Sequence, residues 1–365
     1  MPRRPRRKPT EKSLHSFASR LLDWFAENGR HDLPWQAEVN PYRVWVSEIM
    51  LQQTQVATVI PYFLAFIERF PDVPTLAAAT TDDVLSLWSG LGYYARGRNL
   101  HRAAQIVMSR HGGELPESID TLVALPGIGR STAAAILALS GDQRHAILDG
   151  NVKRVLARFH AVRGWPGETA VARLLWQHAD EHTPEASVAE YTQAIMDLGA
   201  TVCTRGRPRC EACPLAGDCL AWRDGLTGEL PTPRKLKARP ARSVTLLVVS
   251  DTDGATLLER RPASGIWGGL LSFPELQEET EPDEWCRRWL GSAPAAMQPL
   301  ASVAHSFTHF DLTLNPVRLT LGRRETMVMD DDRWLWYKPD EPLPGGIASP
   351  IGKILRELTQ LESPH

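Results

Sequence analysis

The pattern of hydrophobic and polar positions divides the chain into two parts. Between residues 14 and 223 the apolar positions recur every three or four residues, which is the spacing of one helix face. Residues 45–60 and 152–159 are two such stretches, and Pro61 is predicted to end the first of these helices. The sequence therefore predicts a mostly helical region, and residues 1–13 before it form a basic tail.

The pattern becomes mixed in the last third of the chain. Residues 224–241 hold three prolines and few large apolar residues, so we interpret them as a linker. Residues 244–249 predict a buried strand, and the turn signal at 251–254 predicts a second strand after it. Alternation over 312–321 predicts further strands, and an amphipathic helix is predicted at 350–361. We therefore predict an α+β domain over 242–362.

Composition limits the kind of partner. Hydrophobic residues make up 43% and charged residues 23% of the chain, the net charge is −2 and the isoelectric point is about 6.6. No apolar run is long enough for a membrane span, and no apolar segment follows the basic N-terminus, so we expect neither a membrane protein nor a secretory signal. Bulk charge does not favour nucleic acid, so a DNA partner must be held by local basic patches or backbone donors. The basic tail is either such a patch or a solvated segment.

Four of the five cysteines fall within residues 203–219. Their spacing is Cys203-x6-Cys210-x2-Cys213-x5-Cys219, which suits four thiolates around one metal centre in a reducing compartment. The spacing alone leaves both an iron–sulfur cluster and a zinc ion open. Cys286 stands apart and is predicted to be a buried core thiol.

Two segments are candidates for contacts to phosphates. In the segment 125–132, Gly127 and Gly129 precede a predicted helix, and such a turn binds phosphate through backbone N–H groups without needing positive charge. The loop between Cys203 and Cys210 is the second segment, and a solvated loop is the alternative interpretation there. Its three basic residues are Arg205, Arg207 and Arg209.

Two carboxylates are candidates for catalysis. Glu48 lies about 60° from the apolar stripe of its helix, where a side chain can be half-buried. Asp149 directly precedes a predicted helix, where aspartate is an ordinary N-cap. The pattern alone favours structural roles for both residues, and the spacing does not show that they meet in space.

These motifs together resemble the MutY-type adenine DNA glycosylases. The matching segments occur in the order found in that family and cover roughly residues 14 to 357. They are residues 33–35, 45–55, 90–94, 125–132, 147–154, the four cysteines and 264–269. The resemblance implies a helix-hairpin-helix glycosylase fold, a 4Fe–4S cluster rather than zinc, and a C-terminal domain similar to Nudix hydrolases.

The resemblance also assigns roles at the bond between adenine and deoxyribose. Glu48 becomes the general acid towards adenine N7, and Asp149 stays ionised and stabilises the oxocarbenium-like sugar. Asn151 and Ser131 support this site. Endonuclease III-like relatives carry a lysine nucleophile at the position of Ser131, so we expect base removal without efficient strand cleavage.

Further residues are expected to read the DNA. By resemblance, Gln53 and Tyr93 wedge into the duplex near the extruded adenine. Residues Phe307, Thr308 and His309 resemble the family's Phe-Ser-His loop, which reads 8-oxoguanine. Threonine keeps the hydroxyl of the family's serine but adds a methyl group. The segment 96–102, which has four basic residues and no acid, is a further candidate for phosphate contacts.

The resemblance thus predicts a monofunctional glycosylase that acts on double-stranded DNA with adenine opposite 8-oxoguanine or guanine. We expect a monomer in the cytoplasm, of bacterial type and associated with the nucleoid. Glu275, Glu278 and Glu279 lack the spacing of an active Nudix metal site, so the second domain is predicted to read the mispair and not to hydrolyse nucleotides. Two alternatives are a bifunctional endonuclease III-like glycosylase and lyase, and a non-catalytic iron–sulfur DNA-binding protein.

Overall fold

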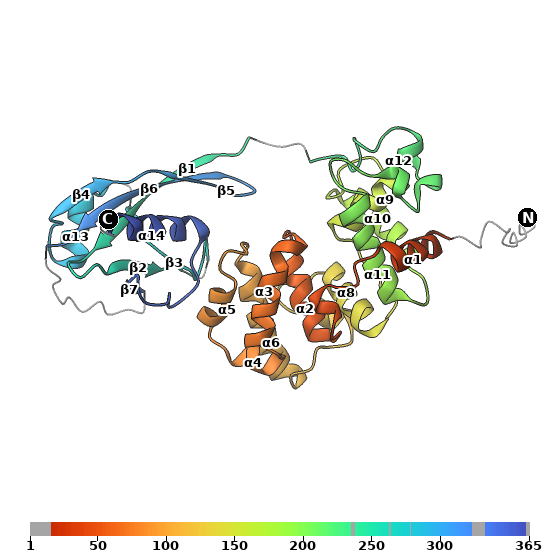
Figure 1. Cartoon of the computed structure of the whole chain (residues 1–365), viewed down its shortest axis with the longest axis horizontal. Helices are drawn as coiled ribbons and strands as arrows, with labels where there is room; N and C mark the ends of the chain where they lie inside the picture. The colour runs from red at the N-terminus through yellow and green to blue at the C-terminus, as the bar shows by residue number, and fades with distance from the viewer. Residues whose placement is uncertain (1–15, 235–237, 263, 278, 323–332, 363–365) are drawn as a thin grey trace, which may run out of the picture. The chain divides into compact units, whose positions relative to one another are not determined.

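The chain folds into two compact units, which are described separately. The structure, a computed structural model, describes residues 16–234, 238–262, 264–277, 279–322 and 333–362 (Figure 1). The first unit comprises Met1–Ala77 and Arg102–Leu236, and the second comprises Ala78–His101 and Lys237–His365. Compact units are not the same as independently folding domains, so the predicted domain limits stay a prediction. The predicted basic tail and Glu278 lie outside the described residues.

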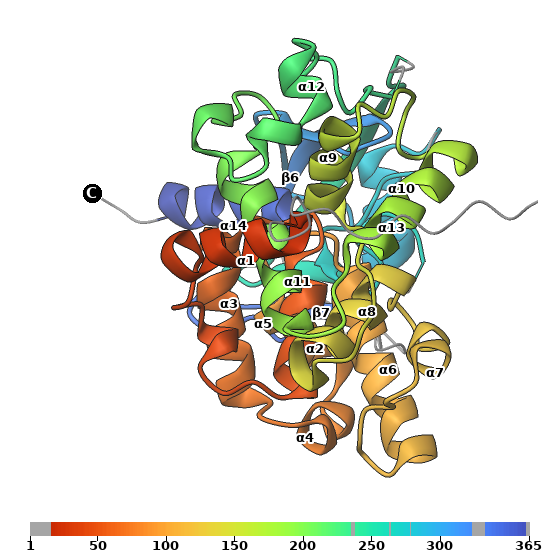
Figure 2. The ribbon, with the colours of Figure 1, turned by 90° about the vertical axis from the view of Figure 1, so that its right-hand side faces the viewer.

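Helices make up the regular structure of the described part of the first unit (Figure 2). Two further helices begin near the unit boundary: α5 (Thr81–Leu87) belongs to the second unit, and α6 (Ala95–His111) runs from the second unit into the first. The other helices are α1 (Phe17–Asn28), α2 (Pro41–Leu51), α3 (Val56–Arg69), α4 (Val73–Ala78), α7 (Ile119–Val123), α8 (Arg130–Gly141), α9 (Gly150–Phe159), α10 (Thr169–His182), α11 (Val188–Asp197) and α12 (Leu220–Arg223). In the part of the chain that the structure describes, no helix is both long and apolar enough to cross a bilayer.

Helix α9 packs its apolar face into a large core of the first unit. Its apolar stripe, Val152, Val155 and Leu156, is buried in a core that also contains residues of α1, α10 and α11. Burial of such side chains stabilises the fold by about 1.5–3 kcal/mol each. The predicted helical stripe at 152–159 is therefore confirmed, and the core fixes both ends of α9.

Residues 45–60 form two helices, whereas the sequence analysis predicted one. The backbone at Gln53 has φ of 61°, the left-handed region, and this turn separates α2 from α3. Pro61 lies inside α3, so the prediction that it ends a helix is wrong. Proline removes one helical hydrogen bond, but Val59, Phe63 and Phe66 are completely buried along α3 and their packing holds the helix together.

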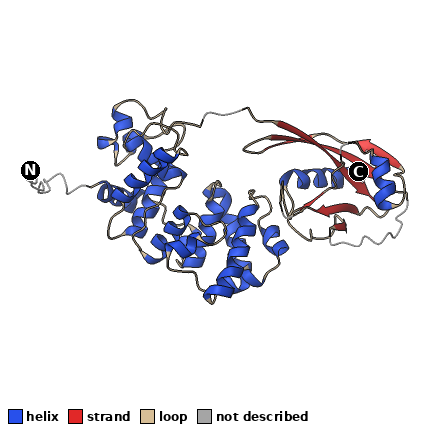
Figure 3. Cartoon of the chain, turned by 180° about the vertical axis from the view of Figure 1, so that it is seen from behind, coloured by secondary structure: helices blue, strands red, loops and turns tan. Residues whose placement is uncertain are grey.

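The second unit contains a mixed sheet, and all strands of the described chain lie in it (Figure 3). Its order is β3-β2-β1-β6-β4, while β5 also pairs with β6 and β7 with β2. Strands β1 and β6 are parallel, from Ala241 opposite Asp311 to Ser250 opposite Thr320, and the other pairs are antiparallel. The strands are β1 (Ala241–Ser250), β2 (Thr256–Arg260), β3 (Leu271–Ser272), β4 (Ala296–Pro299), β5 (Val303–Ser306), β6 (Asp311–Thr320) and β7 (Trp334–Tyr337).

Two helices complete the second unit: α13 (Pro282–Leu290) and α14 (Ser349–Glu362). Leu247 and Leu257 of the sheet form a core cluster with Trp285 and Cys286 of α13. Cys286 has no exposed surface, which confirms that it is a core thiol. The predicted strands at 244–249 and 312–321 and the predicted helix at 350–361 are confirmed as well.

Candidate active site

A cleft of about 860 Å³ in the first unit is lined by all four residues predicted for the catalytic site, Glu48, Ser131, Asp149 and Asn151. Glu48 reaches it from α2, Ser131 from the first turn of α8, and Asp149 from the residue before α9. The cleft is also lined by Arg30, Trp35, Gln53, Asn151, Arg154, Gln193 and Arg205, among others. Two carboxylates that are far apart in the sequence therefore share one cavity.

Asp149 is fixed at the start of α9. Its carboxylate accepts a hydrogen bond from the Val152 amide at 2.8 Å and one from the Asn151 side chain at 3.1 Å. The predicted N-cap is thus present, and it does not remove Asp149 from the cleft. Ser131 fixes Leu148, the residue before Asp149, because the Ser131 hydroxyl accepts a hydrogen bond from the Leu148 amide at 2.9 Å.

Burial acts differently on the two carboxylates. Burial at the wall of the cleft raises the pKa of Glu48 to about 8, and the negative charge of Asp149 adds to this shift. Burial also raises the pKa of Asp149, but the amides of Val152 and Asn151 and the charge of Arg154 act in the opposite direction. Glu48 is therefore the weaker acid of the pair and keeps its proton to higher pH.

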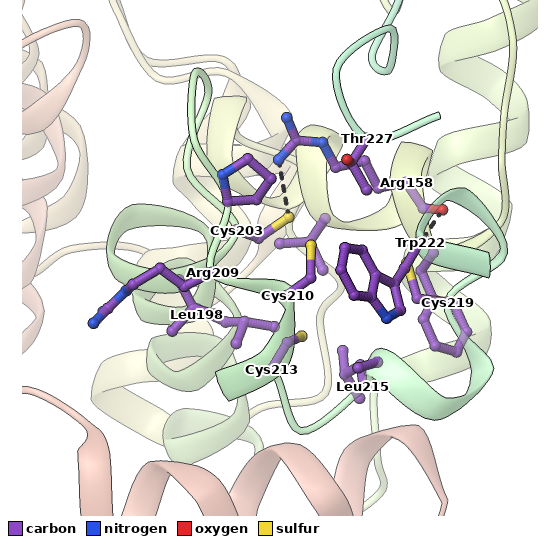
Figure 4. A pocket seen from close by; sticks show the side chains of 15 residues that line it. Arg158, Leu198, Cys203, Arg209, Cys210, Cys213, Leu215, Cys219, Trp222 and Thr227 are labelled. Atoms are coloured by element: carbon purple, nitrogen blue, oxygen red, sulfur yellow. Dashed lines mark hydrogen bonds between the residues drawn. The ribbon is translucent and has the colours of Figure 1, made fainter. Parts of the chain in front are cut away.

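The four clustered cysteines line a second, smaller cavity of the first unit (Figure 4). They follow a run of short turns: a π-helix (Leu198–Val202) precedes Cys203, and short 3-10 turns (Cys210–Ala212 and Ala216–Asp218) precede Cys213 and Cys219. All four are free, half-buried thiols. Among the described residues, no three His, Cys, Asp or Glu side chains converge closely enough to hold a single metal ion. The cysteines therefore surround a space and do not meet at one point.

Two arginines of α9, which the sequence analysis did not single out, connect the cleft with this cysteine cavity. Arg154 donates hydrogen bonds to the Cys203 carbonyl at 2.7 Å and to the Asn151 side chain at 2.8 Å. Arg158 is 2% exposed and donates to the Thr204 carbonyl at 2.7 Å and to the Cys203 sulfur at 3.3 Å. Their spacing of four residues places both arginines on one face of the helix, and this could have been recognised in the sequence. The sequence pattern does not show what that face contacts.

Gly199, in the π-helix before Cys203, packs closely against the start of α9. A Cβ atom at Gly199 would lie 2.6 Å from the Asn151 Cβ, which is closer than real Cβ atoms come. The Gly199 carbonyl also accepts a hydrogen bond from Arg154 at 2.6 Å. The position therefore requires glycine because of close approach, although its backbone needs no left-handed conformation.

The predicted phosphate-binding turn and basic loop are exposed parts of the first unit. Gly127 has φ of 79°, and Gly129 is the N-cap of α8 with no side-chain hydrogen bond to the helix start. Both glycines are exposed, so the helix N-terminus is open to an anion. Arg205, Arg207 and Arg209 of the basic loop are also exposed.

The remaining predicted DNA-reading residues belong to the second unit. Tyr93 is 47% exposed and has φ of 50°. Phe307 stacks on Phe310 with ring centroids 4.5 Å apart, between β5 and β6. Thr308 and His309 follow it as exposed residues, and the Thr308 hydroxyl lies 3.3 Å from the His309 Nδ1.

The segment 96–102 does not present all its basic residues to phosphates. Arg96 is 7% exposed and donates to the Gly92 carbonyl at 3.1 Å, and His101 is 4% exposed and contacts the Ala79 carbonyl at 3.0 Å. The prediction is wrong for these two residues, because both are buried and bind backbone carbonyls, Arg96 in the glycine-rich turn and His101 at Ala79. Arg98 donates to the Gly268 carbonyl.

Sequence comparisons agree with this arrangement. A profile of the HhH-GPD superfamily of base excision DNA repair proteins matches residues 46–181, and a NUDIX domain profile matches residues 245–357. The chain is 36% identical over 339 residues to an adenine DNA glycosylase of Buchnera aphidicola (subsp. Acyrthosiphon pisum), which covers 93% of this chain and 96% of that protein. It is 35% identical to the adenine DNA glycosylase of Mus musculus, covering 93% of this chain and 77% of that protein.

Solved structures share the fold of the helical region. A thermostable thymine-DNA glycosylase superposes with a TM-score of 0.52 at 24% identity, covering 57% of this chain and 95% of that one. An endonuclease III bound to DNA superposes with a TM-score of 0.50 at 19% identity, covering 60% and 99%. The predicted combination of a helix-hairpin-helix glycosylase fold with a Nudix-like α+β domain is confirmed. On the sequence identity over nearly its whole length, the chain belongs to the adenine DNA glycosylase family.

Proposed function

We propose that this chain is a monofunctional glycosylase that hydrolyses the N-glycosidic bond of adenine in DNA, where adenine lies opposite 8-oxoguanine or guanine. Membership of the adenine DNA glycosylase family supports adenine as the base that is removed. The observation that carries the chemistry is the pair Glu48 and Asp149 in one cleft, with the weaker acid beside the stronger one.

Glu48 is proposed to be the general acid. Adenine leaves poorly as an anion, so it must be protonated, at N7, as the bond to C1′ breaks. A carboxyl group with a pKa of about 8 still holds its proton near neutral pH and can supply it. Adenine then leaves as a neutral base.

Asp149 is proposed to remain charged and to stabilise the positive charge that develops on the sugar. The Val152 amide, the Asn151 side chain and the charge of Arg154 all favour its carboxylate form. Water then adds to C1′ and loses a proton to a carboxylate, which gives an abasic site.

Ser131 favours simple hydrolysis over strand cleavage. Its hydroxyl lines the cleft but already accepts the Leu148 amide, and a hydroxyl cannot form a Schiff base with C1′. We therefore propose that the product is an intact strand with an abasic site.

The cysteine cavity is proposed to hold one 4Fe–4S cluster, with Cys203, Cys210, Cys213 and Cys219 as its ligands. A single zinc ion binds thiolates at about 2.3 Å and would draw all four sulfurs to one point. The four cysteines instead line one cavity, which fits a cluster that would take all four as thiolate ligands. When bound, the cluster supplies a redox-active centre and cross-links residues 203–219. Arg158 contributes an N–H donor to the Cys203 sulfur.

The DNA partner is proposed to be a duplex with an extruded adenine, read by exposed residues of both units. Gly127, Gly129 and the basic loop 204–209 are proposed to contact phosphates, and Gln53 and Tyr93 to occupy the vacated space in the duplex. The residues Phe307, Thr308 and His309 are proposed to read the opposite base, with preference for 8-oxoguanine. We propose a monomer that acts in a bacterial-type cytoplasm, at the nucleoid.

One strand-scission assay tests the proposed function. Duplexes with A:8-oxoguanine and A:G are incubated with the protein and then treated with or without hot alkali. The expected result is cleavage only after alkali, on both duplexes, with faster adenine loss opposite 8-oxoguanine. Cleavage without alkali, together with a borohydride-trapped protein–DNA adduct, supports a lyase and contradicts the proposal. DNA binding with no abasic product indicates a non-catalytic protein.

A further inference from the structure

An arginine that directly precedes two residues of the cleft wall is stacked on a tryptophan of another helix. The Arg130 guanidinium carbon lies 3.9 Å from the centroid of the Trp176 ring. Arg130 is the first residue of α8 and is exposed, whereas Trp176, in α10, is half-buried and packs against the core. The core thus holds the ring in place, and the ring supports the guanidinium.

The stacking leaves the arginine free to bind an anion. A guanidinium that lies on an aromatic ring uses its face, whereas its N–H donors point outward in its plane. Within the described residues, Arg130 forms no ion pair with a carboxylate. The contact with Trp176 also restricts a long side chain in advance, which lowers the entropy cost of binding.

The position of Arg130 indicates which anion it meets. The next residues, Ser131 and Thr132, line the cleft together with Glu48 and Asp149. The preceding residue, Gly129, is the exposed N-cap of α8. Since Ser131 and Thr132 lie in the first turn of α8, a DNA strand that delivers one base into this cleft would bring flanking phosphates near that turn.

We propose that Arg130, held flat by Trp176, binds a phosphodiester of the strand whose adenine enters the cleft. Trp176 is a positioning residue and does not itself contact DNA. This inference rests on the proposed function, and it adds a side-chain contact next to the backbone donors of the hairpin. A bound phosphate displaces counterions, so one such contact changes the slope of log Kd against log salt by about 0.9.

The test measures binding to a duplex with a tetrahydrofuran abasic analogue opposite guanine, over a range of salt concentrations. Arg130→Ala is expected to weaken binding about tenfold near 0.15 M salt and to reduce the slope by about 0.9. Trp176→Ala keeps the charge of Arg130 but removes the ring that supports its guanidinium, so we expect a smaller loss of affinity, about threefold. Trp176→Phe should restore binding. The control is Arg110→Ala, an exposed arginine in the last turn of α6, which should leave both values unchanged.

A purely structural pair gives a different pattern. If Arg130 and Trp176 only join α8 to α10, both alanine variants lower the melting temperature and the salt slope stays at the wild-type value, which overturns the inference. Adenine release by the wild type, measured on an A:G duplex, reports the proposed function separately. A wild type that releases adenine, combined with an unchanged slope in Arg130→Ala, contradicts this inference alone. A wild type that releases none contradicts the proposed function.

Discussion

The two ends of α9 lie at two sites in which the buried groups have neighbours of opposite charge. At its start, the cleft places Glu48 beside the negative Asp149, and this arrangement favours a protonated acid. In its second half, the buried cation of Arg158 donates a hydrogen bond to the sulfur of Cys203, in the cavity that the four cysteines line. One helix thus has an anion beside a buried acid at one end and a cation beside a sulfur at the other. The difference shows that a single helix can supply neighbours of either charge to the sites at its two ends.

The largest expected effect concerns the protonated acid of the cleft. Glu48→Gln should slow single-turnover adenine release by about 10²–10⁴-fold or more, because glutamine has the shape of the acid but no proton to give. Binding to the mispair should be unchanged. Glu38→Gln, an exposed carboxylate just before α2, is the matched control and should release adenine normally. Full activity of Glu48→Gln would remove this residue from the mechanism.

The next effect concerns the four cysteines of the other site. Cys213→Ser should lose the bound iron and the visible absorbance and should melt roughly 5–10 °C lower, because the cross-link within residues 203–219 is lost. Iron analysis, the absorption spectrum and thermal unfolding are the measurements. Cys286→Ser is the control for loss of a buried thiol, since it should keep its iron. A colourless wild type with one equivalent of zinc would contradict the proposed cluster.

A smaller effect links the acid of the cleft to stability. The pKa of Glu48 is raised by folding, from an ordinary 4.5 to about 8, so its protonated form stabilises the fold at low pH and this contribution is lost as pH rises through 8. Glu48→Gln removes the titration and should be more stable than the wild type above pH 8, by a few kcal/mol at most. Urea unfolding at pH 5 and pH 8.5 measures the difference. Equal pH dependence of the two proteins would show that Glu48 is not desolvated.

The smallest effect concerns two neighbouring histidines, His160 directly after α9 and His182 at the end of α10. His160 and His182 have Nε2 atoms 2.8 Å apart, and burial lowers the pKa of each to about 4, with the charge of neighbouring histidines adding to it. The unfolded chain takes up protons near pH 6.5, so stability is complete above that value and falls as pH approaches 4.

His182→Phe tests this acid sensitivity, because phenylalanine can keep the stacking on Phe17. The variant should lose about 1 kcal/mol less stability than the wild type between pH 7 and pH 5, since these groups are partly exposed. Thermal unfolding at the two pH values is the measurement. A larger acid loss in the variant would mean that the pair does not titrate as a buried group.

The two sites also differ in how far sequence predicts them. The cysteines lie in one short stretch, so their spacing indicates a common centre before any fold is known, and their metal remains a proposal. The stripe of α9 was predictable for the same reason, because local periodicity determines it. The cleft brings together Glu48 and Asp149, which are far apart in the sequence, and the spacing does not predict this. Only the resemblance to a family predicted that the two carboxylates act at one site.

Tertiary contacts explain the predictions that were wrong or missing. Pro61 remains inside α3 because a buried face outweighs one lost hydrogen bond. Arg96 is turned inward by backbone carbonyls that need donors, although its sequence neighbourhood looks like a surface. The contacts of Arg154 and Arg158 depend on where the cysteine loop returns in space, which no local pattern contains.

The close approach at Gly199 has a consequence for tolerance to substitution. An added methyl group would have to displace Asn151, which donates to Asp149, and would disturb the carbonyl that receives Arg154. A substitution at this position would therefore affect both sites indirectly: Asp149 would lose the hydrogen bond from Asn151, and Arg154, which also binds the Cys203 carbonyl, would lose an acceptor. The absence of a side chain at Gly199 is thus required by the cleft and by the cysteine loop together.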